Sequence, residues 1–217
     1  MFFDLCLILF KFTIIMPGID LFLSRELSYL IKTNLDANVL KQLEHSLFLE
    51  EGMSIKLSIE HFKIFHEHLK KSASFNIQEF EQDRIQEIFN TVKFEKNLQV
   101  GLINPHLIEK FLNYYGDPET RKILLTIMGT SLTVPQILEK SNVLKSPAYR
   151  KIENLLLDGF IVESGKIMKQ TKRIATYECI FDEFQINVMK GKISIDIIFN
   201  REYFDASSVS QCGLFDK

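Results

Sequence analysis

The stretch KSPAYRKIENLLLDGFIVESGK, residues 145–166, constrains the fold of this chain of 217 residues more than any other stretch. Pro147 fits the first position of a helix, where an N–H has no helical partner to lose, and Ser146 before it predicts the N-cap. Gly159 predicts a left-handed end to the same helix, and FIVES (160–164), which begins with three apolar residues, follows at once as a strand. A short helix must therefore pass directly into a strand.

Two more helices are predicted upstream of this one. Asp117 and Pro118 start a helix that runs through Met128. Thr133 and Gln136 form a capping box that begins a second, shorter helix, and a tight turn joins it to the third.

Two hairpins are predicted downstream. RIATYECIF (173–181) pairs with the strand at 160–164 around the loop GKIMKQTK (165–172), and EFQINVM (183–189) pairs with KISIDIIF (192–199). Three short helices followed by a hairpin with a basic tip predict a winged helix-turn-helix.

The amino-terminal half has helical periodicity from residue 21 to about 91. Ser58 is the predicted N-cap of a helix over 59–71, and Asn76 is the predicted N-cap of a helix over 77–92. A short strand is expected at 97–103.

We therefore expect a mainly α protein with a small antiparallel β part, an α+β class. Asn104 and Pro105 predict the helix that joins its two halves. The expected division is an apolar segment (1–20), a helical domain (21–104), a winged helix-turn-helix domain with an extra carboxyl-terminal hairpin (105–200) and a disordered tail (201–217).

The apolar amino end, MFFDLCLILFKFTIIMPG, leaves three interpretations open. It is a buried helix, an extension upstream of a true start at Met16, or a membrane anchor. Asp4 and Lys11 interrupt it, and Pro17 ends it short of the roughly 20 residues that a membrane span needs, so the anchor is the least favoured. Neither the charge pattern nor the small residues of a secretory signal are present.

Two sequence stretches resemble known regulators. SPAYRKIENLLLDGFI (146–161) resembles the recognition helix and wing entry of archaeal winged helix-turn-helix regulators of the ArsR-like type, with Pro147 where that family usually has Thr. The resemblance covers about 117–182. SLFLEEGMSIKLSIEHF (46–62) and NPHLIEKFLNYYGD (104–117) resemble the helical domain that precedes such a winged helix in regulators of ammonia-oxidising archaea. The resemblance implies a DNA-binding transcription regulator and no enzymatic activity.

The distribution of charge agrees with a DNA-binding function. Residues 145–173 hold seven cationic and three acidic side chains, a net charge of +4, whereas the whole chain has a net charge of −2. The rest of the chain therefore carries −6. Positive charge collected on one helix and one hairpin is the pattern that phosphate binding requires.

The recognition helix, expected over 146–158, supplies the predicted base contacts. Lys145, the Ser146 hydroxyl and the free N–H groups of the first turn would bind phosphate. Tyr149, Arg150 and Asn154 would reach base edges, where Arg favours guanine and Asn favours adenine.

The wing, expected over 162–177, supplies the predicted backbone contacts. Lys166, Lys169, Lys172 and Arg173 would lie along phosphates or in the minor groove, and Lys151 of the helix would contact the backbone as well. These residues also have interpretations without DNA. The lysines of the hairpin are then solvated surface residues, Tyr149 packs against the protein, and Arg150 forms surface ion pairs with Glu153 or Asp158.

Other functions find less support in the residues. No Gly-rich phosphate loop or nucleophile elbow is present, and His61, His66 and His68 lack the i, i+4 spacing of a helical metal site, so we expect no cofactor and solvent-facing histidines. Three cysteines spread along the chain indicate a reducing, cytoplasmic setting.

The expected partner is double-stranded DNA bound by a homodimer, because most helix-turn-helix regulators are dimeric; the amphipathic helices and the apolar amino end are candidate dimer surfaces. The alternatives are a winged helix that binds protein and a ligand-sensing regulator. The first would expose hydrophobic residues over 145–173, and the second would enclose an apolar pocket between residues 21 and 100.

Overall fold

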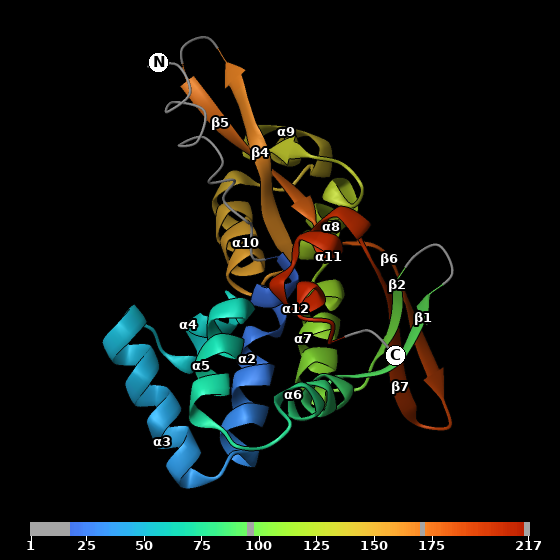
Figure 1. Cartoon of the computed structure of the whole chain (residues 1–217). Helices are drawn as coiled ribbons and strands as arrows, with labels where there is room; N and C mark the ends of the chain where they lie inside the picture. Colours follow the sequence, from blue (N-terminus) through green and yellow to red (C-terminus); the bar gives the residue numbers. More distant parts are fainter. Residues whose placement is uncertain (1–17, 95–97, 170–171, 215–217) are drawn as a thin grey trace, which may run out of the picture.

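The computed structural model describes residues 18–94, 98–169 and 172–214, and it has the predicted α+β class (Figure 1). Helices form most of the regular structure, and the strands form two antiparallel sheets. The helices of the amino-terminal half are α2 (Gly18–Asn34), α3 (Ala37–Ser46) with a π-helical turn (Leu47–Glu51), α4 (Ile55–Ile59), α5 (Phe62–Ser72) and α6 (Ile77–Gln86).

A four-stranded sheet joins the two halves of the chain. Its strands, in the order β1-β2-β7-β6, are β1 (Phe89–Phe94), β2 (Leu98–Leu102), β7 (Lys192–Phe199) and β6 (Phe181–Met189). Val100 of β2 pairs with Ile197 of β7, and both side chains are fully buried. Helix α7 (Pro105–Gly116) lies beside this sheet in Figure 1, and the ring of Phe111 is 4.7 Å from that of Phe184 on β6.

The predicted three helices and hairpin follow α7 in the expected order. They are α8 (Pro118–Ile127), β3 (Leu132–Thr133), α9 (Val134–Ser141), α10 (Lys145–Leu157), β4 (Ile161–Lys169) and β5 (Lys172–Cys179). The second sheet has the order β3-β5-β4. Figure 1 shows the β4–β5 hairpin extending away from the body of the molecule, with α10 beside its base.

One aromatic core connects the predicted domains. Phe160, between α10 and β4, is fully buried and lies 5.3 Å from Phe22 of α2, 5.5 Å from Phe111 and 5.6 Å from Phe181, measured between ring centroids. The expected boundary at residue 104 therefore does not separate two independent cores. The extra hairpin belongs to the sheet that includes β1 and β2, and not to the hairpin sheet of α8–α10.

Gly159 allows this close approach. Its φ is +71°, as the sequence predicted, and a Cβ placed there would lie 2.4 Å from the backbone N of Phe22. Only glycine accepts both the left-handed conformation and the contact with α2.

The tail after residue 200 was expected to be disordered, and this prediction is wrong for residues 201–214. They form α11 (Arg201–Ala206) and α12 (Ser208–Gln211). The buried carboxylate of Asp20 on α2 accepts hydrogen bonds from the backbone N–H groups of Ser208, at 2.8 Å, and Val209, at 3.0 Å. Long-range hydrogen bonds order the tail, and its local composition gave no sign of them.

Several caps confirm the local sequence reasoning. Asn76 caps α6 through the N–H of Glu79, Asn104 caps α7 through the N–H of Leu107, and Thr133 starts α9 in its capping box. These are contacts between neighbours in the sequence, which is why the sequence predicts them.

Other boundaries differ from the prediction. Ser58 is not an N-cap: it lies inside α4, is fully buried, and donates its hydroxyl to the carbonyl of Ile55 at 2.8 Å. Ser54 caps α4 instead. The helix expected over 77–92 ends at Gln86 because the next residues pair as β1 with β2.

Residues 1–17 of the apolar amino end lie outside the described residues, and residues 18–20 open α2. Within the described ranges, no helix is both long and apolar enough to cross a bilayer.

Candidate nucleic-acid interface

The amino end of α10 differs from the prediction by two residues. Leu144 is the N-cap, in an extended conformation and with no side-chain hydrogen bond, so Ser146 is the second residue of the helix and not its cap. Pro147 at the third position has no N–H, and the N–H of Ala148 is bonded to the carbonyl of Leu144. The free backbone donors of the first turn therefore lie two residues earlier in the chain than the sequence predicted.

The outer side of α10 is open to solvent. Arg150 and Asn154 are exposed and Tyr149 is 52% exposed. Arg150 forms no ion pair with Glu153 or Asp158, which was the alternative to DNA contact, and it has no hydrogen bond or ion pair within the described ranges. The opposite side, which consists of Ala148, Ile152 and Leu155, is buried.

Lys151 points to α8 instead of outward. Its amine forms ion pairs with the carboxylates of Asp117 and, at 3.5 Å, of Glu119, and its side chain is 19% exposed. The hydrogen bond from Lys151 lowers the pKa of Asp117 to about 2, with a smaller contribution from Thr120. Lys151 therefore holds α10 against α8, and its predicted contact with phosphate conflicts with this pairing.

The β4–β5 hairpin is longer than predicted. The expected loop at 165–172 is wrong, because strand pairing continues to Lys169 and Lys172. A register shift between Glu163 and Gly165 leaves Ser164 as the extra residue of a bulge, and Gly165 pairs with Thr176. The cations of this hairpin therefore lie on the strands β4 and β5 and not in a loop.

Cross-strand pairing assigns the hairpin cations to both faces. Met168 pairs with Arg173, and Lys166 with Ala175, so Lys166 and Arg173 share one face while Lys172 belongs to the other. Lys166 is 3.3 Å from Glu163, whereas Lys172 and Arg173 are exposed and have no partner in the described part of the chain. The side chain of Lys169 lies outside what the structure describes.

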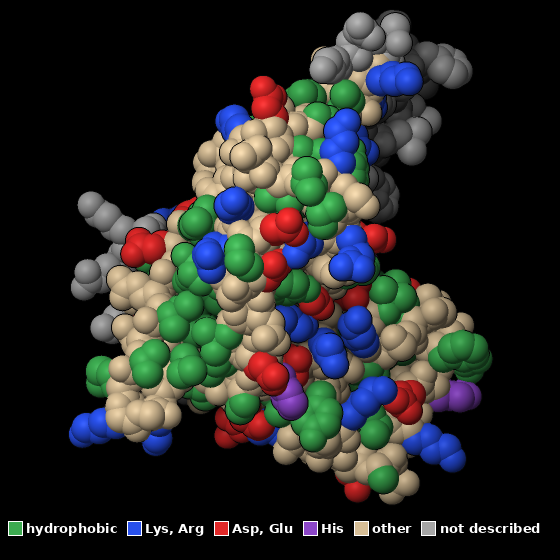
Figure 2. All heavy atoms as spheres, turned by 180° about the vertical axis from the view of Figure 1, so that it is seen from behind, with side chains coloured by type: hydrophobic (Ala, Val, Ile, Leu, Met, Phe, Trp, Pro, Cys, Tyr) green, Lys and Arg blue, Asp and Glu red, His purple; other side chains and the backbone are tan. Residues whose placement is uncertain are grey.

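Among the side chains that the structure describes, it thus brings four cations without a described partner to α10 and the hairpin. They are Lys145, Arg150, Lys172 and Arg173. Figure 2 shows Lys and Arg side chains gathered along the middle of one face, with acidic side chains between them. The surface has mixed charge and is less positive than the count of +4 suggested.

Exposed apolar side chains accompany these cations, and such exposure over residues 145–173 is the feature expected of a winged helix that binds protein. Leu144 is 76% exposed, and it lines a groove of about 420 Å³ between α9 and α10 together with Leu138 and Tyr149. On the hairpin, Ile167 and Met168 are 44% and 64% exposed. In the sequence, Ile167 and Met168 lie between Lys166 and Lys169, and this position is the one local indication that they are exposed.

The carboxyl end of α10 is anchored to α7. Asp158 accepts hydrogen bonds from the amine of Lys110, at 3.1 Å, and from the hydroxyl of Tyr114. Tyr114 also donates to the backbone carbonyl of Asn154 at 3.3 Å. Burial, and then the contact with Asp158, raise the pKa of Tyr114. One end of α10 is fixed and the other is open.

Two of the three histidines are placed differently from expectation, whereas His61 is exposed as expected. His68 is 2% exposed and lies 3.1 Å from the Ser46 hydroxyl, and His66 is 2.8 Å from the buried carboxylate of Glu81, so neither faces solvent freely. No group of three or more His, Cys, Asp or Glu side chains in the described ranges is arranged to hold a metal ion. Cys179 is fully buried, and burial raises the pKa of its thiol.

Comparison of the chain with protein-family models, with curated proteins and with solved structures finds no match. The resemblance to ArsR-like regulators therefore remains a prediction, and function has to be argued from the geometry.

Proposed function

We propose that the chain is a winged helix-turn-helix transcription regulator that binds double-stranded DNA in the cytoplasm. The observation that carries the proposal is the open amino end of α10, where Lys145 and Arg150 have no partner among the described residues. A projecting hairpin with the equally unpaired Lys172 and Arg173 lies beside it (Figure 1).

Each element suits a different part of a duplex. A helix fits into the major groove, which is about 12 Å wide, so the exposed Arg150 and Asn154 would face base edges. A hairpin with cations on both faces suits a groove, because phosphates flank a groove on both sides. The proposed complex is a homodimer on half-sites about one helical turn apart.

The test is a selection of bound sequences from a random pool of duplexes at two salt concentrations. We expect an enriched motif with two related half-sites, and we expect weaker binding at the higher salt concentration because counterions are released. Recovery of no motif at either salt concentration would contradict sequence-specific reading.

A second candidate function is docking of a protein partner on the same edge. The observation that favours it is the groove between α9 and α10, whose rim Leu144 is 76% exposed. A photo-crosslinking residue in place of Leu144 separates the two candidates in a cell extract. Adducts to nucleic acid support the regulator, and adducts to one protein support the docking module.

A further inference from the structure

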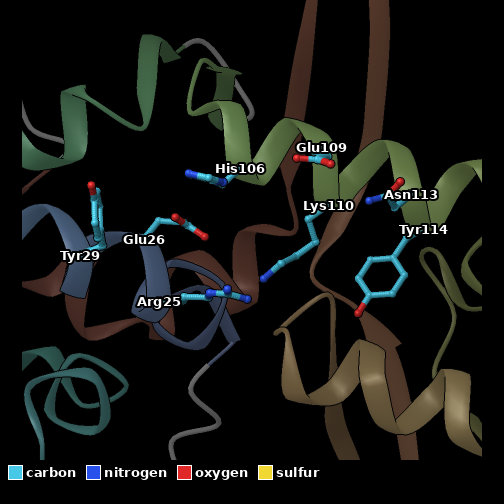
Figure 3. A pocket seen from close by; sticks show the side chains of 8 residues that line it. All are labelled: Arg25, Glu26, Tyr29, His106, Glu109, Lys110, Asn113 and Tyr114. Carbon is cyan, nitrogen blue, oxygen red and sulfur yellow. The ribbon is translucent and has the colours of Figure 1, made fainter.

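A polar groove of about 470 Å³ lies between α2 and α7. Figure 3 shows charged and polar side chains from the two helices facing one another across it. It is separate from the apolar groove of α9 and α10, and it differs from the apolar pocket that a ligand-sensing helical domain was expected to enclose.

Glu26 is the unusual residue of this groove. It is 5% exposed, yet within the described ranges its carboxylate has no hydrogen bond and no ion pair. Glu81, which is also buried, is held by His66 through one carboxylate oxygen, at 2.8 Å. The carboxylate oxygens of Glu26 are not among the fully enclosed side-chain atoms that lack a partner in the described ranges, so they are accessible from the groove to a cationic ligand. Figure 3 shows the Glu26 side chain directed into the groove.

Two cations face the same space from opposite helices. Figure 3 shows the guanidinium of Arg25 and the amine of Lys110 approaching one another at the centre of the groove. Arg25 has no partner in the described part of the chain. The amine of Lys110 forms an ion pair with the carboxylate of Asp158 at 3.1 Å. The groove therefore offers a free carboxylate beside a pair of cations.

We propose that this groove binds a small zwitterion, an α-amino acid. The ammonium group of the ligand pairs with Glu26, and its carboxylate is held by Arg25 together with Lys110. An α-amino acid carries both charges on one carbon, so it matches opposite charges only a few ångströms apart, whereas a simple amine or a simple carboxylate satisfies one side alone. The volume lies within the range of small-molecule sites.

The groove is connected to α10 through α7. Lys110 and Tyr114 both contact Asp158 at the carboxyl end of α10, and Lys110 belongs to the ligand site as well. A ligand carboxylate competes with Asp158 for Lys110 and so loosens the anchored end of α10. This coupling to DNA affinity rests on the proposed function, although binding in the groove does not.

Binding is tested by calorimetric titration of the full chain with each of the twenty standard L-amino acids. We expect at least one to bind with a dissociation constant at or below about 1 mM. We expect the N-acetyl form, which lacks the ammonium, and the methyl ester, which lacks the carboxylate, to bind at least about tenfold more weakly. The proposal is overturned if none of the twenty binds or if both blocked forms bind as well as the parent.

Variants locate the site. Arg25→Ala and Glu26→Gln each weaken binding at least about tenfold, whereas Lys41→Ala, on the exposed side of α3, leaves it unchanged. Arg25 is exposed, so its variant remains folded and decides the question even if the Glu26 variant does not fold. Unchanged affinity in Arg25→Ala overturns the assignment.

The coupling has two measurements of its own, and the first of them, hydrogen exchange, needs no DNA. The bound amino acid should increase hydrogen exchange of the amides at 154–159, and it should weaken duplex binding by the same factor by which the duplex weakens binding of the amino acid. Binding without any change in exchange at the end of α10 refutes the coupling. Binding together with a complete failure to bind duplex refutes the proposed function and leaves the groove site standing.

Discussion

The helical body and the edge formed by α10 with the β4–β5 hairpin use their charged side chains differently. In the body, some of the ionisable groups that lie farthest from solvent pair internally: Glu81 with His66 at 2.8 Å, and Asp20 with the backbone N–H of Ser208 at 2.8 Å. At the edge, Arg150 and Arg173 are exposed and have no partner among the described residues. The pairs of the body stabilise the fold, whereas the two arginines of the edge remain available to a partner.

The largest effect on this comparison is expected from a substitution at Gly159, where the edge contacts α2 of the helical body. Gly159→Ala places a Cβ 2.4 Å from the backbone of Phe22, at a φ of +71°. We expect a loss of about 3–5 kcal/mol in the free energy of unfolding, measured by urea denaturation. As a control, Gly116→Ala, where the added Cβ meets nothing within 4 Å, should cost little. Equal stability of the two variants would contradict the shared core.

The next largest effect is the pH dependence of stability that we expect from Glu81, which contacts His66. Burial raises the pKa of Glu81 from 4.5 to about 7, although the hydrogen bond with His66 opposes this. Between these two values the folded protein binds a proton that the unfolded chain has released, so the stability falls as pH rises through this window, by up to about 3 kcal/mol.

A substitution of Glu81 tests whether this residue causes the pH dependence of stability. Glu81→Gln should flatten the decrease in the free energy of unfolding between about pH 4.5 and pH 7, whereas Glu79→Gln on the same helix, at an exposed position, should retain it. A decrease of the same size in the Glu81 variant would assign the pH dependence to other groups.

A smaller effect is expected for the tail. Asp20→Ala removes the acceptor for the N–H groups of Ser208 and Val209, one of which is buried. We expect a loss of about 2 kcal/mol and faster hydrogen exchange over 207–214. Protection of these amides at the level of the unsubstituted protein would show that apolar contacts alone hold the tail.

The smallest effect on stability belongs to the edge. Lys145→Ala and Lys172→Ala should each change the free energy of unfolding by less than about 0.5 kcal/mol, because neither side chain has a partner in the described part of the chain. Lys151→Ala should cost more, because it removes the ion pairs with Asp117 and Glu119. A large decrease in the free energy of unfolding of Lys145→Ala would show that this side chain of the edge stabilises the fold.

The sequence predicted what neighbouring residues decide. The caps at Asn76 and Asn104 and the capping box at Thr133 all depend on contacts within four residues. Contacts between distant residues were not predicted. The pairing of β2 with β7 joins segments about one hundred residues apart, and no local pattern specifies that partner.

The candidate site was partly predicted for the same reason. The buried side of α10 and the exposure of Arg150 follow from helical periodicity. The pairing of Lys151 with Asp117 does not, because it depends on how α8 packs against α10. The groove between α2 and α7 also arises only when two distant helices meet.

The most direct test of the account is the salt dependence of duplex binding in two variants of equal charge. Arg150→Ala combined with Arg173→Ala removes two cations from the edge, and Lys56→Ala combined with Lys70→Ala removes two exposed cations from the body. We expect the edge variant to bind at least about tenfold more weakly, with a slope of log affinity against log salt reduced by about 2, and the body variant to match the unsubstituted protein. Equal affinity and equal slope in all three proteins would contradict the claim that the edge binds nucleic acid.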